Sequence, residues 1–252
     1  MTAETFDTAR ERLRPYVERA SVASGWSFPV HSRLLEPRPW DYDKRAQALI
    51  ASATSLLDIG TGGGERLSRY CSEYGNGAIA TESWPPNAPV AANTLSHLEI
   101  PVILCDDKRL PFASGTFDLI LNRHSGFDPA NVAPLLRPGG TLLTEQVWDH
   151  WRELKEYFPR MVESRGHHTA NSEGLTAAGL FLTDDRTSVV PAAYVNLGEF
   201  VFMLCVTPWT IPDFDPLGRD LEALVQLERD RSTQDGLIMS DGHFLIEAHN
   251  PA

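Results

Sequence analysis

Residues 56–65 read LLDIGTGGGE, an apolar run that passes into a glycine-rich turn. The apolar run predicts a buried strand, and the next helix is expected to begin near Glu65. Glycines at alternate positions, Gly60, Gly62 and Gly64, let the backbone bend sharply and leave no Cβ to keep a ligand away. The stretch therefore predicts the first strand and turn of a nucleotide-type binding site, although an ordinary strand-to-helix turn can also carry three glycines.

Apolar and amphipathic segments alternate along the next 80 residues. We expect strands at 77–82, 102–105, 116–122 and 141–147, with helices at 65–72 and 90–97 between the first of them. Five strands that alternate with helices predict a parallel, doubly wound α/β sheet, whose ligands bind at the carboxyl ends of the strands. Helical spacing over 3–22 and a helix at 43–52 predict an N-terminal helical cap at 1–47, followed by a ligand-binding domain at 48–252.

The second expected strand ends in an acid, Glu82, 22 residues beyond Gly60. A carboxylate at this place can accept both hydroxyls of a ribose. A solvated carboxylate at the end of a strand is the alternative. Trp84 and two prolines follow, and they are well placed to form a wall against one face of an adenine.

The composition limits the classes of partner. The formal net charge is −12 and no stripe of Lys and Arg is visible, which argues against nucleic acid. Three widely spaced cysteines among apolar neighbours indicate core residues of a reducing compartment, and no zinc-binding spacing occurs, so no metal is expected. No run is apolar and long enough for a membrane span or a secretory leader, and we therefore expect a cytoplasmic protein without a membrane partner.

Aromatic residues gather outside the expected sheet. Trp40 and Tyr42 precede the first strand, and Trp209 and Phe214 lie in a proline-containing stretch near the end. They are candidates for the binding of a small-molecule acceptor, with core packing as the alternative. His167 and His168 are adjacent, but without a companion ligand they are expected in a surface loop.

Position 65 separates two enzyme classes that use such a turn. A dinucleotide turn of the form G-x-G-x-x-G/A that begins at Gly60 requires Gly or Ala at this position. Glu65 would instead place a carboxylate beside the diphosphate. A ligand without phosphate meets no such obstacle, so the turn disfavours a nicotinamide dehydrogenase.

Five motifs in order resemble the class I S-adenosylmethionine-dependent methyltransferases, and most closely their subgroup with an Asp-x-x-x-Leu-Pro-Phe third motif. They are LLDIGTGGGE (56–65), TE (81–82), CDDKRLPF (105–112), TFDLIL (116–121) and LRPGGTL (136–142). The resemblance spans residues 55–147 and implies a seven-stranded, mostly parallel Rossmann-like sheet that ends in an antiparallel hairpin. It also implies that S-adenosyl-L-methionine is the cofactor.

The resemblance assigns roles to residues of these motifs. Glycines of the turn would approach the methionine portion, Glu82 would bind the ribose hydroxyls, Asp106 would meet the adenine amino group and Asp58 would hold the turn through backbone amides. The full set of expected cofactor-binding residues is Asp58, Gly60, Thr61, Gly62, Gly64, Glu82, Ser83, Trp84, Asp106, Asp107, Asn122 and Arg123.

The fourth expected strand ends in Asn122-Arg123-His124, which is not the Asn/Asp-Pro-Pro-Tyr motif of many methyltransferases that act on amino groups of nucleic acids and proteins. With the acidic charge, this departure favours a small-molecule acceptor, such as a secondary metabolite, methylated on O, N or C. His124 is the expected general base, because an imidazole accepts a proton near neutral pH; packing at the strand end is the alternative. A protein that binds the cofactor without methyl transfer, as a sensor, a scaffold or another kind of catalyst, is the second hypothesis.

Overall fold

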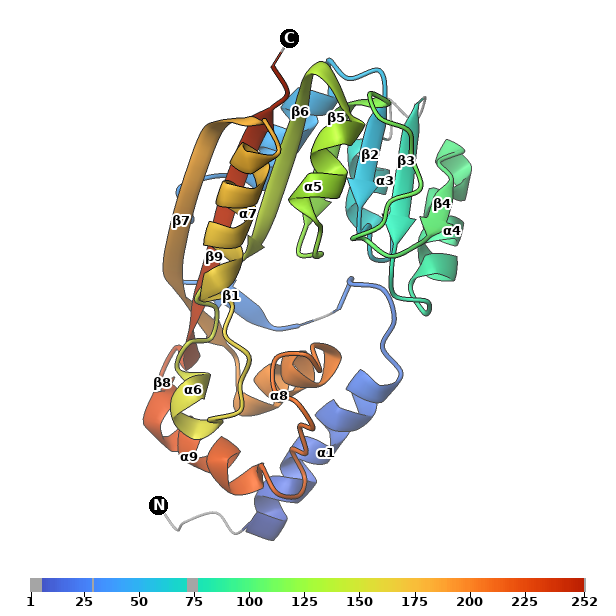
Figure 1. The fold of residues 1–252 in the computed structure, drawn as a ribbon. Coiled ribbons are helices and arrows are strands. Elements are labelled where there is room, and N and C mark those ends of the chain that lie inside the picture. The colour runs from blue at the N-terminus through green and yellow to red at the C-terminus, as the bar shows by residue number, and fades with distance from the viewer. Residues whose placement is uncertain (1–5, 29, 72–76, 252) are drawn as a thin grey trace.

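The computed structural model describes residues 6–28, 30–71 and 77–251, and a single sheet runs through them (Figure 1). Its strand order is β1-β7-β9-β6-β5-β2-β3-β4, with β8 paired to β9. The strands are β1 (Ser32–Leu34), β2 (Leu56–Ile59), β3 (Ala78–Glu82), β4 (Val102–Leu104), β5 (Phe117–Arg123), β6 (Leu136–Val147), β7 (Phe181–Tyr194), β8 (Ser232–Thr233) and β9 (Gly236–His249).

The parallel half of the sheet contains β2 to β6. From β2 the chain builds outward to β3 and β4, then returns to place β5 and β6 on the opposite side of β2. The strand order therefore reverses between β2 and β5. In doubly wound sheets ligands bind at this reversal, outside the carboxyl ends of the strands. The expected fold class is confirmed, and the expected glycine turn lies at the reversal point.

Alternating side chains of the strands feed two separate cores. Leu56, Leu119 and Leu121 pack on one face, while Leu57 and Ile120 pack on the other. The first face is covered by α2 (Tyr42–Ile50), α3 (Glu65–Tyr70) and α4 (Ala88–Leu95), and the second by α5 (Pro129–Val132) and α7 (Arg165–Ala177). Helices on both faces give the three layers seen in Figure 1.

A long antiparallel hairpin extends the sheet. β7 and β9 have 14 residues each, and their pairing continues to Tyr194 opposite Leu237. This is the final hairpin that the resemblance implied. Two short strands are added to the expected seven, because β1 pairs with β7 and β8 pairs with β9.

A lobe of helices lies beyond the end of this hairpin (Figure 1). It contains α1 (Phe6–Ser21), α6 (Leu154–Tyr157), α8 (Leu197–Val206) and α9 (Leu221–Arg231). Ala9 and Leu13 of α1 are fully buried in its core, together with Phe200 of α8 and Leu224 of α9. The N-terminal helix thus packs on helices from the connection between β7 and β9. The division of the chain near residue 47 stays a prediction.

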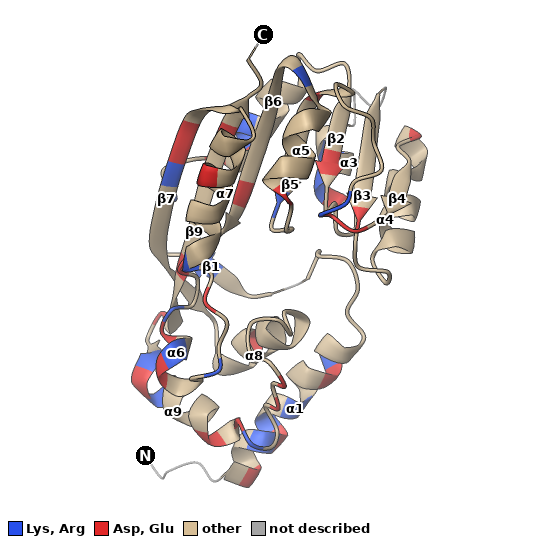
Figure 2. Ribbon diagram, viewed as in Figure 1, with Lys and Arg blue, Asp and Glu red and all other residues tan. Residues whose placement is uncertain are grey.

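Charged residues are mixed on the helical lobe, where Figure 2 shows acidic and basic positions side by side on α1, α6 and α9. Many form ion pairs, such as Arg12 with Glu228 (2.6 Å) and Arg19 with Glu199 (2.7 Å). No helix of the described segments combines the length and the apolar character needed to cross a membrane.

The loop predicted for His167 and His168 is wrong, because both lie in α7. His168 is an ordinary packing residue there: its Nε2 lies 2.5 Å from Oδ1 of Asp185, and its ring contacts Phe244 edge-on. The helix was missed because a single buried residue, Leu175, gives this polar segment little apolar periodicity.

Candidate active site

The glycine turn between β2 and α3 has the backbone geometry that only glycine adopts easily. Gly60, Gly62 and Gly64 have φ angles of 69°, 66° and 80°. Protein atoms also approach them closely: a Cβ on Gly60 would overlap Ser125, and one on Gly62 would lie 2.5 Å from Cδ1 of Trp26. The turn therefore requires glycine both for its conformation and for its packing.

Thr81 and Glu82, at the end of β3, hold the amides of this turn. The Gly60 and Thr61 amides donate to the side-chain and main-chain oxygens of Thr81 (3.4 and 2.9 Å), and the Gly62 amide donates to Oε2 of Glu82 (2.6 Å). The expectation that Asp58 holds the turn is therefore wrong for these amides. Asp58 lies on β2 two residues before Gly60, and its carboxyl group interacts with the Thr61 hydroxyl instead.

Asp58 is an unusual acid for this position. Burial is the largest influence on its pKa, and the carboxylates of Glu82 and Asp107 add to it, against the opposing effects of the Thr61 hydroxyl and Arg66. The net result raises the pKa of Asp58 to about 6. Its protonation state therefore depends on the anions and cations bound nearby.

Glu82 is almost fully buried at the carboxyl end of β3. Its second oxygen accepts from the Trp84 amide (2.8 Å), and burial raises the pKa of its carboxyl group above the usual value. A carboxylate can accept about four hydrogen bonds, so each oxygen keeps room for a hydroxyl donor. This burial of Glu82 does not fit the alternative of a solvated carboxylate at the end of a strand.

The two acids after β4 differ sharply in environment. Asp106 is exposed and accepts from the Lys108 amide (2.9 Å), whereas Asp107 is buried and accepts from the hydroxyls of Ser83 (2.8 Å) and Ser125. The other oxygen of Asp107, Oδ1, is buried and has no partner within the described residues. A buried acceptor without a donor fits a bound ligand that supplies one.

Asn122 has a structural side chain at the end of β5. Its amide group donates to main-chain oxygens of Ile59 and Ser125, and its oxygen accepts from Thr144 and Gln146. Only its main-chain carbonyl faces a candidate ligand-binding residue, since the Tyr42 hydroxyl donates to it (3.3 Å). A role of Asn122 in cofactor binding stays a prediction.

Trp26 was missed as a site residue. Its ring lies on Gly62, and the segment is held there because the Gly25 amide donates to Asn87 (2.9 Å) and the Trp26 amide donates to Glu65 (3.1 Å). An aromatic residue so far upstream of the turn carries no spacing that links it to the glycines. Only the path of the chain between α1 and β1 brings it there.

The four residues expected to bind an acceptor fall into separate places. Trp40 donates from Nε1 to Glu145 (2.7 Å), and Tyr42 lies under Arg123. Trp209 is exposed, with its ring 6.1 Å from Trp26. Phe214 packs edge-on against Phe158 in the core of the helical lobe, which is the core-packing alternative.

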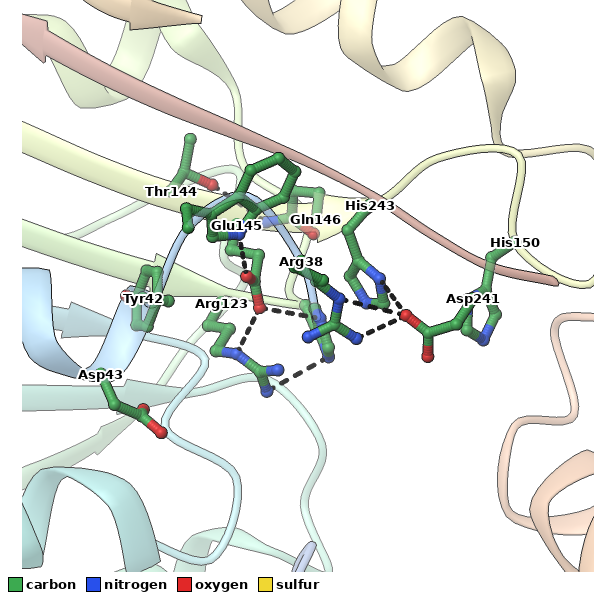
Figure 3. A network of polar contacts seen from close by, with 12 residues as sticks. Arg38, Tyr42, Asp43, Arg123, Thr144, Glu145, Gln146, His150, Asp241 and His243 are labelled. Atoms are coloured by element: carbon green, nitrogen blue, oxygen red, sulfur yellow. Dashed lines mark hydrogen bonds and ion pairs between the residues drawn. The ribbon is translucent and has the colours of Figure 1, made fainter. Parts of the chain in front are cut away.

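A cluster of histidine, arginine and acidic side chains lies beside this site (Figure 3). We call it the His–Arg cluster and define it as Arg38, Arg123, His124, Glu145, His150, Asp241 and His243. Arg123 pairs with Glu145 (2.7 Å), and Arg38 pairs with Asp241 (2.5 Å). The rings of His124 and His243 stack at 4.9 Å.

His124 sits directly after β5 with a φ of 59°, and its side chain is 35% exposed. Burial among its neighbours, then the charge of Arg123 and the histidines His243 and His150, lowers the pKa of His124 well below 6.5. Similar causes lower the pKa of His150 to about 3. Both rings are therefore neutral near pH 7.

Donor atoms within the His–Arg cluster also approach the spacing of a metal site. In the part of the chain that the structure describes, two groups have donor atoms within 4.8 Å of one another: His124, Glu145 and His243, and His150, Asp241 and His243. They come from three distant segments, so no spacing in the sequence could have revealed them. Sequence reasoning found His124 and Arg123 of this cluster and missed the others.

Residues 57–144 match the family model of a methyltransferase domain. This segment contains the glycine turn, Glu82, Asp107 and the cluster residues of β5. The fold around it is that of Rossmann-like methyltransferases of known structure.

Individual relatives are distant. Over 132 residues the chain is 25% identical to the ubiquinone/menaquinone biosynthesis C-methyltransferase UbiE of Cupriavidus metallidurans; the match covers 48% of this chain and 54% of that protein. The chain thus spans about half the length of this relative. Two solved structures share the fold over nearly the whole chain: a functionally unknown protein from Deinococcus radiodurans R1 (TM-score 0.60, 17% identity, 94% and 98% covered) and the (4+2)-cyclase SpnF (TM-score 0.54, 16%, 100% and 98%).

Proposed function

We propose that this chain is an S-adenosylmethionine-dependent methyltransferase that acts on an O, N or C nucleophile of a small molecule. The observation that carries the proposal is the junction of the glycine turn with two buried acids, Glu82 and Asp107, at the reversal of the sheet. The match of residues 57–144 to a methyltransferase domain supports it. The relative UbiE, which is a C-methyltransferase, also supports it.

The residues present fit the cofactor. The buried carboxylates of Glu82 and Asp107 offer acceptors for hydroxyl and amino donors, and Oδ1 of Asp107 lacks a partner within the described chain. Ser125 and Trp26 fill the space at the Cβ positions of Gly60 and Gly62, so a ligand at the turn would meet these side chains as well as the main chain. When bound, the cofactor supplies an electrophilic methyl group on a sulfonium.

The chain's own residues would position the acceptor and hold its proton. Arg123 can only donate, so its contact at 3.4 Å makes Nδ1 of His124 the acceptor and places the ring hydrogen on Nε2, which lies 3.7 Å from Glu145. Nδ1 carries the free lone pair of the ring, so it would take a proton from the acceptor once the Arg123 N–H no longer occupies it. Glu145, only 2% exposed, would stabilise the resulting imidazolium.

Titration calorimetry tests the cofactor half of the proposal. The chain should bind S-adenosylmethionine and its demethylated product, and it should not bind NAD, because Glu65 opposes a diphosphate. Incubation with methyl-labelled cofactor and a panel of phenols, quinols and amines should then give a product heavier by one methyl group. Binding of NAD in preference to S-adenosylmethionine would contradict the proposal.

His124→Asn tests the base. With an active acceptor, turnover should fall by about 10²–10⁴ while cofactor affinity is kept, because the titratable nitrogen is lost. Since the pKa of His124 is lowered, the acidic limb of the wild-type rate profile should lie below pH 6.5, and it should vanish in the variant. Near-normal turnover across pH 6–9 would reduce His124 to a packing residue.

A catalyst that does not transfer methyl is the second candidate. One observation favours keeping it: SpnF, named a cyclase, has the same fold over the whole length of this chain. A likeness at 16% identity concerns the fold alone. Cofactor binding with conversion of an acceptor but no gain of methyl mass would support this candidate over methyl transfer.

A further inference from the structure

The His–Arg cluster contains more hydrogen-bond donors than its own acids use. A guanidinium carries five N–H groups. Arg38 directs Nε and Nη2 at the same oxygen of Asp241 (3.1 and 2.5 Å), and Arg123 directs Nε at Glu145 (2.7 Å). Within the described segments, Nη1 of Arg38 and Nη2 of Arg123 make no hydrogen bond to protein. Both side chains are about four-fifths buried, at 19% and 21% exposed.

The acids of the cluster already accept hydrogen bonds from other side chains. Glu145 accepts from Arg123 on one oxygen and from Trp40 on the other (2.7 Å each), and it is 2% exposed. Oδ1 of Asp241 accepts both hydrogen bonds from Arg38. Within the described residues, no hydrogen bond joins the remaining guanidinium donors to an acid of the cluster.

His150 adds one further donor to the cluster. The Gly242 amide donates to Nδ1 of His150 (3.2 Å), so the hydrogen of this neutral ring sits on Nε2. Arg38 acts electrostatically on both His124 and His150, where it lowers the pKa of each ring.

We infer that the acceptor bound next to His124 carries a carboxylate, which the free N–H groups of Arg38 and Arg123 receive. This rests on the proposed function and names the class of its substrate. A planar guanidinium matches a carboxylate with two parallel hydrogen bonds, and such pairs are about twice as strong as neutral hydrogen bonds.

A divalent cation is the competing occupant, and the contacts oppose it. Nδ1 of His243 lies 2.9 Å from Oδ1 of Asp241, a spacing that a shared metal ion would also produce. That same oxygen, however, accepts both hydrogen bonds of Arg38, and both oxygens of Glu145 are taken. A metal ion here would also sit beside two guanidinium charges.

The test compares an acid with its neutral analogue on the chain saturated with S-adenosylhomocysteine. Calorimetry measures 4-hydroxybenzoate against 4-hydroxybenzyl alcohol, which share the phenol and differ in the carboxylate. Wild type should bind the acid at least tenfold more tightly, and Arg38→Gln should remove most of that preference. Arg33→Gln is the matched control, because Arg33 is exposed on β1 and pairs with Asp235 (2.6 Å) away from the cluster. Arg33→Gln should keep the preference.

A second measurement needs no variant. The imidazole NMR signals of His124 and His150 should shift with 4-hydroxybenzoate and stay in place with the alcohol. Equal binding of the two probes, no binding of either, or equal losses in both variants would overturn the carboxylate assignment. Binding of Zn²⁺ that disappears in His243→Ala would replace it with a metal site. Failure to bind S-adenosylhomocysteine would contradict the proposed function. It would not bear on the proposal that the acceptor carries a carboxylate.

Discussion

Glu82 has two tasks in this structure, since it accepts from the Gly62 and Trp84 amides and is also the expected ribose acceptor. Removal of the whole side chain would leave two amides without partners, whereas Glu82→Gln keeps an acceptor for one of them and turns its NH₂ group toward the other. It keeps one oxygen acceptor and the side-chain shape. We expect the affinity for S-adenosylmethionine to fall by about 1.5–3 kcal/mol, roughly 10- to 150-fold, because hydrogen bonds to an ionised group are lost.

Calorimetry measures this change, with Glu173→Gln on the exposed side of α7 as the control. The control should bind like wild type. Unchanged affinity in Glu82→Gln would remove Glu82 from the cofactor site and leave it as a clamp on the turn.

Asp58 should make the stability depend on pH. Its folded-state pKa is raised to about 6 from 3.8, so its favourable contribution is complete below about pH 4 and is lost as the pH rises through 6. Asp58→Asn removes this loss. The stability of the variant relative to wild type should therefore increase between pH 4 and 7, by up to about 3 kcal/mol.

Urea unfolding of both proteins across this pH range measures the difference. Comparison with wild type cancels the opposite trend of His124 and His150, whose lowered pKa values cost stability as the pH falls. A difference that does not vary with pH would show that Asp58 is ionised in the folded chain throughout.

Among the elements, α1 is held by its buried face. Sequence periodicity predicted an amphipathic helix in an N-terminal cap, and Ala9 and Leu13 are fully buried in the core of the helical lobe. Leu13→Ala should destabilise the protein by about 2–5 kcal/mol, because the cavity forms in a packed core. Arg14→Ala, one exposed position further along the same helix, should change stability by less than about 0.5 kcal/mol.

Urea unfolding followed by circular dichroism gives both values. Calorimetry at a temperature where both variants are folded should show that they bind S-adenosylmethionine like wild type, since α1 does not contact the glycine turn. A cost below 1 kcal/mol for Leu13→Ala would mean that α1 is loosely attached and free to act as a lid.

For the molecule as a whole, cofactor binding should couple to the stability of the folded chain. Only the folded state brings together the glycine turn, Glu82, Asp107 and Trp26. S-adenosylhomocysteine therefore binds that state alone. At 100 times its Kd it should add about 2.7 kcal/mol, or roughly 5–10 °C in Tm for a chain of this size. Thermal unfolding monitored by calorimetry measures the shift, which should shrink in Glu82→Gln; a shift unaffected by that variant would place the ligand elsewhere.

Local signals in the sequence determined the central sheet. The strands β2, β3 and β5 are short apolar runs next to a turn or helix signal, and their burial follows from their own residues. β6 begins at Leu136, before the expected strand at 141–147, and β4 is only partly buried. The glycine turn and Glu82 could be recognised in the sequence, because the backbone conformation of the turn and the charge at the strand end each depend on only a few neighbouring residues. The final hairpin was implied only by resemblance, and α7 was missed because its buried face is a single leucine.

Only the tertiary structure decided which distant side chains share the site. Trp26 meets Gly62 across 36 positions. The His–Arg cluster joins Arg38, the end of β5, the end of β6 with the loop after it, and the middle of β9. Apolar periodicity is a property of one segment, and it determined the sheet. The pairing of β9 with β6 and β7 is a property of the whole chain, and it placed Asp241 and His243 beside Arg123 and His124. No spacing within a single segment encodes that contact, because the energy that makes it comes from packing the two halves of the sheet together.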